Sequence, residues 1–91
     1  MARSFDKIPI ILGELIKKHR LRKNISQAEL ALNAGINVSY LSTVECGYSY
    51  ISISKFLDLC EALDLSPVYV MHEFTEEIKK IDDLDRFKDK F

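Results

Sequence analysis

The sequence has few of the residues that build catalytic loops, disulfide frameworks or metal sites. Its three glycines are too widely separated to form a phosphate-binding loop. Its two cysteines, Cys46 and Cys60, are too few for the disulfide framework of a small secreted domain. Together with His19 and His72 they lack the spacing of zinc ligands, and the sequence suggests no Ser-His-Asp or Cys-His arrangement. We therefore expect no enzymatic activity, no cofactor and no metal.

Long hydrophobic runs are also missing. No window approaches the roughly 18 apolar residues that a membrane span needs, and residues 1–11 hold no apolar core long enough for a signal peptide. We expect a cytoplasmic location and no membrane partner. The chain of 91 residues has the size of one domain. Because so short a chain buries a limited share of its surface, a core shared within a dimer would help it.

The charge is unevenly distributed, although the net charge is only −1. Residues 1–50 carry seven basic and four acidic residues, a balance of +3. Residues 51–91 carry six basic and ten acidic residues, a balance of −4. This asymmetry indicates that the N-terminal half is the candidate surface for a polyanion.

The apolar residues recur at helical spacing, and no stretch alternates as a β-hairpin does. Capping residues, glycines and prolines mark the expected ends. They predict helices over residues 9–23, 27–33, 38–45 and 53–63, a fifth helix from Pro67 and a sixth, amphipathic helix from Thr75. The fourth helix is expected to bury Ile53, Phe56, Leu57, Leu59, Cys60 and Leu63. The tail carries an apolar stripe of Phe74, Ile78, Ile81, Leu84, Phe87 and Phe91.

The stretch SQAELALNAGINVSYLSTVECG, residues 26–47, has the features of two short helices joined by a tight turn. Ser26 and Glu29 form a capping box, Ala31 is small enough to lie where the helices cross, and Gly35 accepts the positive φ that the turn needs. A helix of this width fits the major groove of DNA. Apolar residues are expected to hold the pair together: Leu30, Ile36, Leu41 and Val44. Short polar residues remain exposed on the second helix, beside Val38 and Tyr40: Ser39, Ser42 and Thr43.

This stretch resembles the helix-turn-helix proteins of the Cro and phage-repressor family, also called the XRE family. The resemblance covers about residues 10–72 and includes Leu12-Gly13, Arg20 before Gln27, SQAELALNAG, SYLSTVE and the CEALDLSP end of the fourth helix. It implies an all-α fold, a compact five-helix lambda-repressor-like DNA-binding domain, here with an additional C-terminal amphipathic helix. We assign residues 1–74 to that domain, with the helix-turn-helix motif at about 26–46, and residues 75–91 to a helical tail.

The resemblance also implies roles for single residues. Val38, Ser39 and Thr43 take positions that look like base readers, with Ser42 beside them. Gln27 takes a position that contacts a phosphate or base through its amide, although a merely solvated side chain is the alternative. Positions that look like clamps on the DNA backbone are taken by Asn37, Tyr40, Ser49 and Tyr50. For Tyr40, packing on the first helix is equally compatible with the sequence.

Three further residue assignments concern structure rather than DNA contact. Arg20 and Glu45 map onto the family's structural ion pair between the first helix and the end of the recognition helix. Cys46 stands where the family often has a polar or basic residue. His19 and His72 are expected at the surface or at helix ends. The recognition helix has no Arg, Lys or Gln, the usual partners of guanine and adenine, so specificity is expected to rest partly on DNA shape.

These observations predict a sequence-specific transcription regulator that binds double-stranded DNA as a homodimer on a pseudo-palindromic operator. The dimer contact is expected on Val70, Met71 and Phe74, with Ile78, Ile81 and Phe87 adding to it. A tail folded back on its own domain is the alternative. Short members of the family include restriction–modification controller proteins, phage-type repressors and antitoxins. The rival function is an antitoxin or protein-interaction module whose acidic C-terminal half binds a partner protein.

Overall fold

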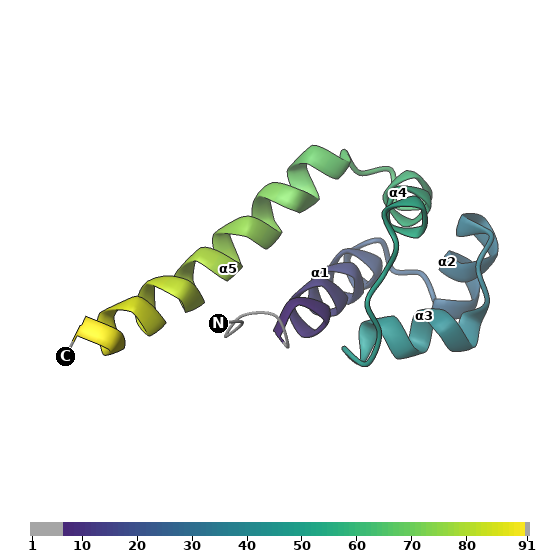
Figure 1. Cartoon of the computed structure of the whole chain (residues 1–91). Helices are drawn as coiled ribbons and strands as arrows, with labels where there is room; N and C mark the ends of the chain where they lie inside the picture. Colours follow the sequence, from purple (N-terminus) through teal and green to yellow (C-terminus); the bar gives the residue numbers. More distant parts are fainter. Residues whose placement is uncertain (1–6, 91) are drawn as a thin grey trace.

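The computed structural model describes the backbone of residues 7–90 and the side chains of residues 7–81. This part of the chain forms five helices and no strand (Figure 1), which confirms the all-α fold class. The helices are α1 (Ile8–Arg22), α2 (Gln27–Ala34), α3 (Val38–Glu45), α4 (Ile53–Ala62) and α5 (Pro67–Lys90). Within the described residues, none of these helices combines the length and the apolar character that crossing a bilayer requires.

Side-chain caps and one glycine determine where the short helices begin and end. The hydroxyl oxygens of Ser26 and Ser52 accept hydrogen bonds from the backbone N–H groups of Glu29 and Lys55, at 3.0 and 3.1 Å. Gly35 ends α2 with φ +70°, a left-handed conformation that costs a residue with a Cβ more than it costs glycine. The predicted boundaries of α1 to α4 agree with the structure to within one residue, because these signals are local.

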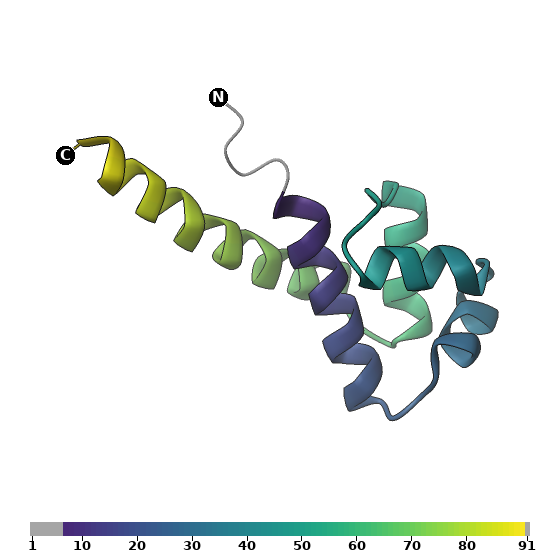
Figure 2. The ribbon, with the colours of Figure 1, turned by 90° about the horizontal axis from the view of Figure 1, so that it is seen from below.

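The core lies where α1 to α4 meet the first turns of α5. Its most completely buried large side chains are Leu30, Leu41, Leu59 and Val44. Figure 2 shows α1 lying between α5 on one side and α3 on the other, and α1 contacts both of these helices. The helix α1 therefore contacts both α5 and α3, the second helix of the helix-turn-helix motif.

The C-terminal region differs from the sequence-based expectation. The predicted fifth and sixth helices form one continuous helix, since no glycine or proline follows Pro67 up to Lys90. Both views show the C-terminal half of α5 extending beyond the other helices (Figure 1 and Figure 2). The expected boundary after residue 74 thus falls inside a helix.

Two residues of α4 that were expected in the core are exposed. Ile53 is 69% exposed and Leu57 is 45% exposed, whereas Phe56, Leu59 and Cys60 are buried. The prediction failed because the apolar arc of α4 is wider than the stripe of about 100° that packing on one core requires. The apolar residues of α4 that lie outside the buried stripe, Ile53 and Leu57, form a separate apolar stripe at the surface.

Of the two places expected for His19, the helix end is confirmed, because His19 lies in the last turn of α1, whereas the surface is wrong. His19 is 5% exposed, because α5 covers this side of α1. Its ring meets the ring of Tyr69 edge to face, with centroids 6.0 Å apart, and its Nε2 lies 2.6 Å from Oε1 of Glu73. The sequence could not reveal this burial, because it depends on which helix packs over α1. His72, by contrast, is exposed, as expected.

Candidate nucleic-acid interface

The helix α3 packs on the core through its inner face and is capped at its N-terminus. Leu41 and Val44 are at most 1% exposed and hold its inner side against the core. At its start, the side-chain oxygen Oδ1 of Asn37 accepts a hydrogen bond of 2.7 Å from the backbone N–H of Ser39. This cap leaves the amide nitrogen of Asn37 as the group that can donate outward. The opposite side of α3 is therefore presented to solvent on a fixed support.

A buried ion pair anchors the C-terminal end of α3 to α1. Arg20 donates from Nε and Nη2 to the two carboxylate oxygens of Glu45, at 2.7 and 3.0 Å. Its Nη1 also donates to the backbone carbonyl of Ile25 at 2.8 Å. The Arg20 and Glu45 side chains are 9% and 2% exposed. This pair of hydrogen bonds fixes both the position and the orientation of the last turn of α3 relative to α1. The two charges neutralise each other within the protein.

Gln27 joins the same network from the first turn of α2. Its Nε2 donates to Oε1 of Glu45 at 2.9 Å, and the residue is half-buried. The second N–H and the carbonyl oxygen of the amide are not used by this bond. Gln27 is therefore not simply solvated: it connects α2 to the end of α3 and keeps donor and acceptor capacity for another group.

The outward side of α3 carries Val38, Ser39 and Thr43, which we call the reading face. Val38 is 44% exposed, Ser39 is exposed and Thr43 is half-buried. The hydroxyl of Thr43 donates to the backbone carbonyl of Ser39 at 2.9 Å. Its oxygen is thus left as a hydrogen-bond acceptor. The reading face is open and offers one methyl-rich and two hydroxyl-bearing side chains.

The residues expected to contact the DNA backbone differ in how far they are exposed. Asn37 is exposed, and Tyr50 in the loop after α3 is 62% exposed. Tyr40 is half-buried and packs against the core, so its ring supports the fold. Ser42 and Ser49 are also half-buried. Tyr48, to which the sequence analysis gave no role, is 83% exposed in the same loop.

Among the described side chains, few positive charges are available near the helix-turn-helix motif. Arg20 and Lys18 are held by carboxylates, whereas Lys17, Arg22 and Lys23 are exposed on α1 and just after it. The helix α3 itself contains no basic residue. Attraction of a polyanion to this surface therefore depends on a small number of lysine and arginine side chains and on helix N-termini.

A second exposed surface is an apolar hollow of about 480 Å³ between α4 and α5. We call it the α4–α5 groove. It is lined by Ile53, Phe56, Leu57, Pro67, Val68, Met71, His72 and Thr75. Three of these residues are large apolar side chains with substantial exposure, at 69% for Ile53, 45% for Leu57 and 77% for Val68. Contiguous exposed apolar surface of this kind is typical of an interaction site.

The residues expected at the dimer contact lie in different environments. Val70 is 2% exposed and belongs to the core, so it offers almost no surface of its own to a second copy. Phe74 is half-buried and packs against the core, whereas Met71 lines the groove. Ile78 and Ile81 are half-buried farther along α5. Phe87 lies outside the residues whose side chains are described.

Sequence reasoning missed Ile53, Leu57 and Val68 as surface residues. The usable signal was the width of the apolar arc on α4, which exceeds what one buried face needs. Val68 carries no such signal, because its neighbour Val70 has the same side chain and is buried. Which of two valines faces the core depends on how α5 is rotated against α1.

Comparison with known proteins agrees with this geometry. Residues 16–70 match the family model of helix-turn-helix domains. The chain belongs to the XRE-type helix-turn-helix family. Among curated proteins, none matches the sequence.

Several solved structures of this family are similar to the chain. The restriction–modification controller protein C.AhdI from Aeromonas hydrophila is 32% identical, over 68% of this chain and 94% of its own, with a TM-score of 0.66. The clp gene regulator ClgR from Corynebacterium glutamicum is 26% identical, over 88% of both chains, with a TM-score of 0.74. The controller protein C.Esp1396I, solved as a tetramer with its natural operator of 35 base pairs, is 25% identical over 78% of this chain and 93% of its own, with a TM-score of 0.72. The XRE-type protein described here thus has the fold of DNA-binding transcription regulators.

Proposed function

We propose that this protein is a sequence-specific transcription regulator that binds a pseudo-palindromic operator as a homodimer, with α3 in the major groove. The observation that carries the proposal is the open reading face on a helix that is anchored along its inner side and at its last turn. Leu41 and Val44 hold that helix from beneath, and the Arg20–Glu45 pair holds its last turn. Side chains can read bases precisely only when the backbone that carries them is held rigidly in place.

The chemistry of the reading face suggests which base edges it recognises. The Thr43 oxygen is an acceptor, because its proton is given to the Ser39 carbonyl, and it suits the amino group of adenine or cytosine. Val38 presents methyl groups that suit the methyl group of thymine. The Ser39 hydroxyl can donate or accept. This set tolerates several bases, so DNA shape is expected to contribute to specificity.

Groups around the reading face suit the phosphate backbone. Asn37 keeps its amide nitrogen free to donate, since its oxygen caps α3. Gln27 keeps one N–H beyond its bond to Glu45. Phosphate contacts of this type orient a protein on the duplex without reading sequence. We assign Tyr40 and the loop residues Ser49 and Tyr50 to the same surface, and we place Ser42 beside the reading face.

The second copy is proposed to bind across the α4–α5 groove. Its exposed apolar side chains, Ile53, Leu57 and Val68, with half-buried Met71, form one surface on two adjacent helices. A two-fold dimer pairs such a patch with itself and places two recognition helices about 34 Å apart, one turn of DNA. The operator-bound tetramer of C.Esp1396I supports an oligomeric DNA-bound form. Ile78 and Ile81 are the α5 residues that would extend the contact.

Selection of bound duplexes from a random DNA pool tests the DNA-binding part of this proposal. The wild-type protein is expected to enrich two inverted half-sites. The variant Ser39→Ala/Thr43→Ala should enrich a different motif while keeping its helical circular-dichroism spectrum. The matched control is Glu76→Ala on the exposed side of α5, which should enrich the wild-type motif. Enrichment of no motif by the wild-type protein would refute DNA reading.

Sedimentation tests the dimer. A charge placed in the groove, Leu57→Lys, should convert the protein to a monomer, because an unpaired charge at a buried apolar contact is strongly unfavourable. Leu32→Lys is the control, since Leu32 is 80% exposed on α2 and lies outside the groove. Dimers that persist in Leu57→Lys would place the contact elsewhere.

A further inference from the structure

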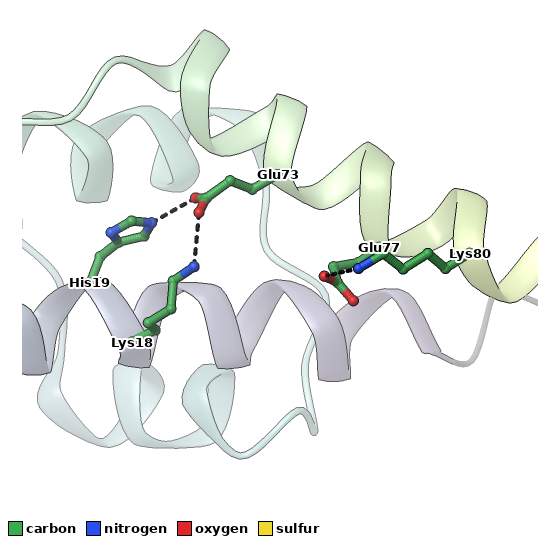
Figure 3. Close-up of polar contacts among 5 residues, drawn as sticks. All are labelled: Lys18, His19, Glu73, Glu77 and Lys80. Atoms are coloured by element: carbon green, nitrogen blue, oxygen red, sulfur yellow. Dashed lines mark hydrogen bonds and ion pairs between the residues drawn. The ribbon is translucent and has the colours of Figure 1, made fainter.

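Three side chains clamp α5 to α1. Glu73 on α5 receives a hydrogen bond of 2.8 Å from Nζ of Lys18, and its other carboxylate oxygen lies 2.6 Å from Nε2 of His19 (Figure 3). The Glu73 side chain is 17% exposed and that of His19 is 6% exposed. One carboxylate thus holds two neighbouring residues of α1 from a largely buried position. We call Lys18, His19 and Glu73 the α1–α5 clamp.

The clamp and the α4–α5 groove lie on roughly opposite sides of α5. At about 100° per residue, Glu73 lies about 160° around the helix axis from Met71 and from Thr75, and those two residues line the groove. Tyr69, one turn before Glu73, meets the ring of His19 on the same side. The helix α5 therefore carries a dimer surface on one side and its attachment to α1 on the other.

Adjacent residues of α1 hold the two functional helices. His19 binds Glu73 of α5, and Arg20 binds Glu45 at the end of α3. Both α1 side chains are largely buried. The contacts that α1 makes with α5 and with the end of α3 thus start from adjacent residues in the same turn of α1.

We propose that the α1–α5 clamp determines the angle between the dimer helix and the recognition helix, and thereby the spacing of operator half-sites that the dimer accepts. This inference rests on the proposed function. Glu73 is in this account a positioning residue: it contacts no base, and it acts through the direction in which α5 leaves the domain.

The geometry of DNA makes such an angle consequential. Adding one base pair between half-sites moves the second site by about 3.4 Å along the axis and about 34–36° around it, since a turn takes 10–10.5 base pairs. A dimer with a fixed α5 has to twist or bend the DNA to accept that change, which costs free energy. A dimer in which α5 can change its direction accepts the altered spacing with a smaller loss of affinity.

The test measures binding of the full-length protein to its selected duplex and to duplexes with one base pair added to or removed from the spacer. The wild-type protein should bind the altered spacers about tenfold more weakly or worse. In Glu73→Gln the penalty should fall below about threefold, while affinity for an isolated half-site stays unchanged. Glu76→Gln removes the same charge on an exposed turn of α5, where Glu76 pairs only at 3.8 Å with Lys79, and should keep the wild-type penalty.

Lys18→Gln provides a milder variant if Glu73→Gln does not fold. The Lys18 side chain is 39% exposed, so its removal leaves no buried cavity, and the spacer penalty should again fall. A Glu73→Gln or Lys18→Gln protein that folds and keeps the full wild-type penalty would overturn the clamp proposal and leave DNA reading intact. A wild-type protein with no preference for paired half-sites would overturn the proposed function and this inference with it.

Discussion

Gly13 of α1 lies directly against the backbone carbonyl of Val44 in the last turn of α3. A Cβ at position 13 would stand 2.1 Å from that carbonyl oxygen and 3.2 Å from the carbonyl oxygen of Glu45. Backbone atoms cannot rotate aside as a flexible side chain does. The close approach of α1 to the recognition helix therefore requires glycine at this position.

The variant Gly13→Ala is expected to lose stability and to displace α3. Overpacking a tight contact typically costs about 1–3 kcal/mol, and a clash with backbone falls at the upper end of that range. Urea denaturation measures the free energy of unfolding. The neighbouring exposed variant Glu14→Ala should change it by less than about 0.5 kcal/mol. Equal stability of the two variants would show that α1 and α3 do not meet as described.

The Arg20–Glu45 pair should be costly to break from one side. Glu45→Gln keeps the shape of the side chain but leaves the largely buried guanidinium without a charged partner, a change that typically costs about 3–5 kcal/mol. The double variant Arg20→Met/Glu45→Leu should lose less free energy of unfolding than Arg20→Met and Glu45→Leu lose together as single variants. The reason is that no unpaired charge remains in the double variant. A double-mutant cycle in urea measures the difference. Additive effects would mean that the pair does not interact.

The clamp predicts an acid-dependent contribution to stability. Partial burial would raise the pKa of Glu73, but the hydrogen bonds and charges of Lys18 and His19 together lower that pKa below its usual range. A carboxyl group whose folded-state pKa is depressed stabilises the protein above its unfolded-state pKa, about 4.3. This stabilisation is lost as the pH falls through the folded-state pKa.

Glu73→Gln should therefore be less stable than the wild-type protein at neutral pH, and the gap should close on acidification below about pH 4. Urea denaturation across the acid range measures this gap. Glu76→Gln on the exposed turn of α5 serves as the control. A gap for Glu73→Gln that stays constant down to pH 2 would contradict the role given to its charge.

How much the sequence predicted depends on whether a feature is local. The bounds of α3 were predicted correctly, because Asn37 caps its start and its inward residues recur at helical spacing. The helix-turn-helix family was also apparent from residues close together in the chain. Local signals of this kind need no knowledge of which helices pack together.

Features that depend on packing between distant helices were predicted less well. The exposure of His19, Ile53 and Val70 differs from what was expected. The burial of His19 depends on α5, which packs over α1. For Ile53 and Val70, the rotation of α4 or α5 decides which face of the helix the residue occupies. The sequence analysis began a separate helix at Thr75, but no glycine or proline interrupts the chain between Pro67 and Lys90, so one helix continues through this position.

Binding to the selected operator should depend only moderately on salt. Arg20 and Lys18 are occupied by carboxylates, and α3 carries no basic residue. If each half-site neutralises about two or three phosphates, the slope of log K against log salt concentration for a dimer is roughly −4 to −5. Fluorescence anisotropy over a range of salt concentrations measures it. A slope steeper than about −8 would contradict this small number of phosphate contacts.

The central claim is that the reading face meets base edges in the major groove. A photo-crosslinking amino acid placed at Ser39 tests it most directly, with the same group at exposed Lys79 on α5 as the control. On the selected duplex, the group at position 39 should attach to bases within a half-site, and the group at position 79 should attach to none. Crosslinks from position 79 to bases, or none from position 39 under saturating protein, would contradict the account.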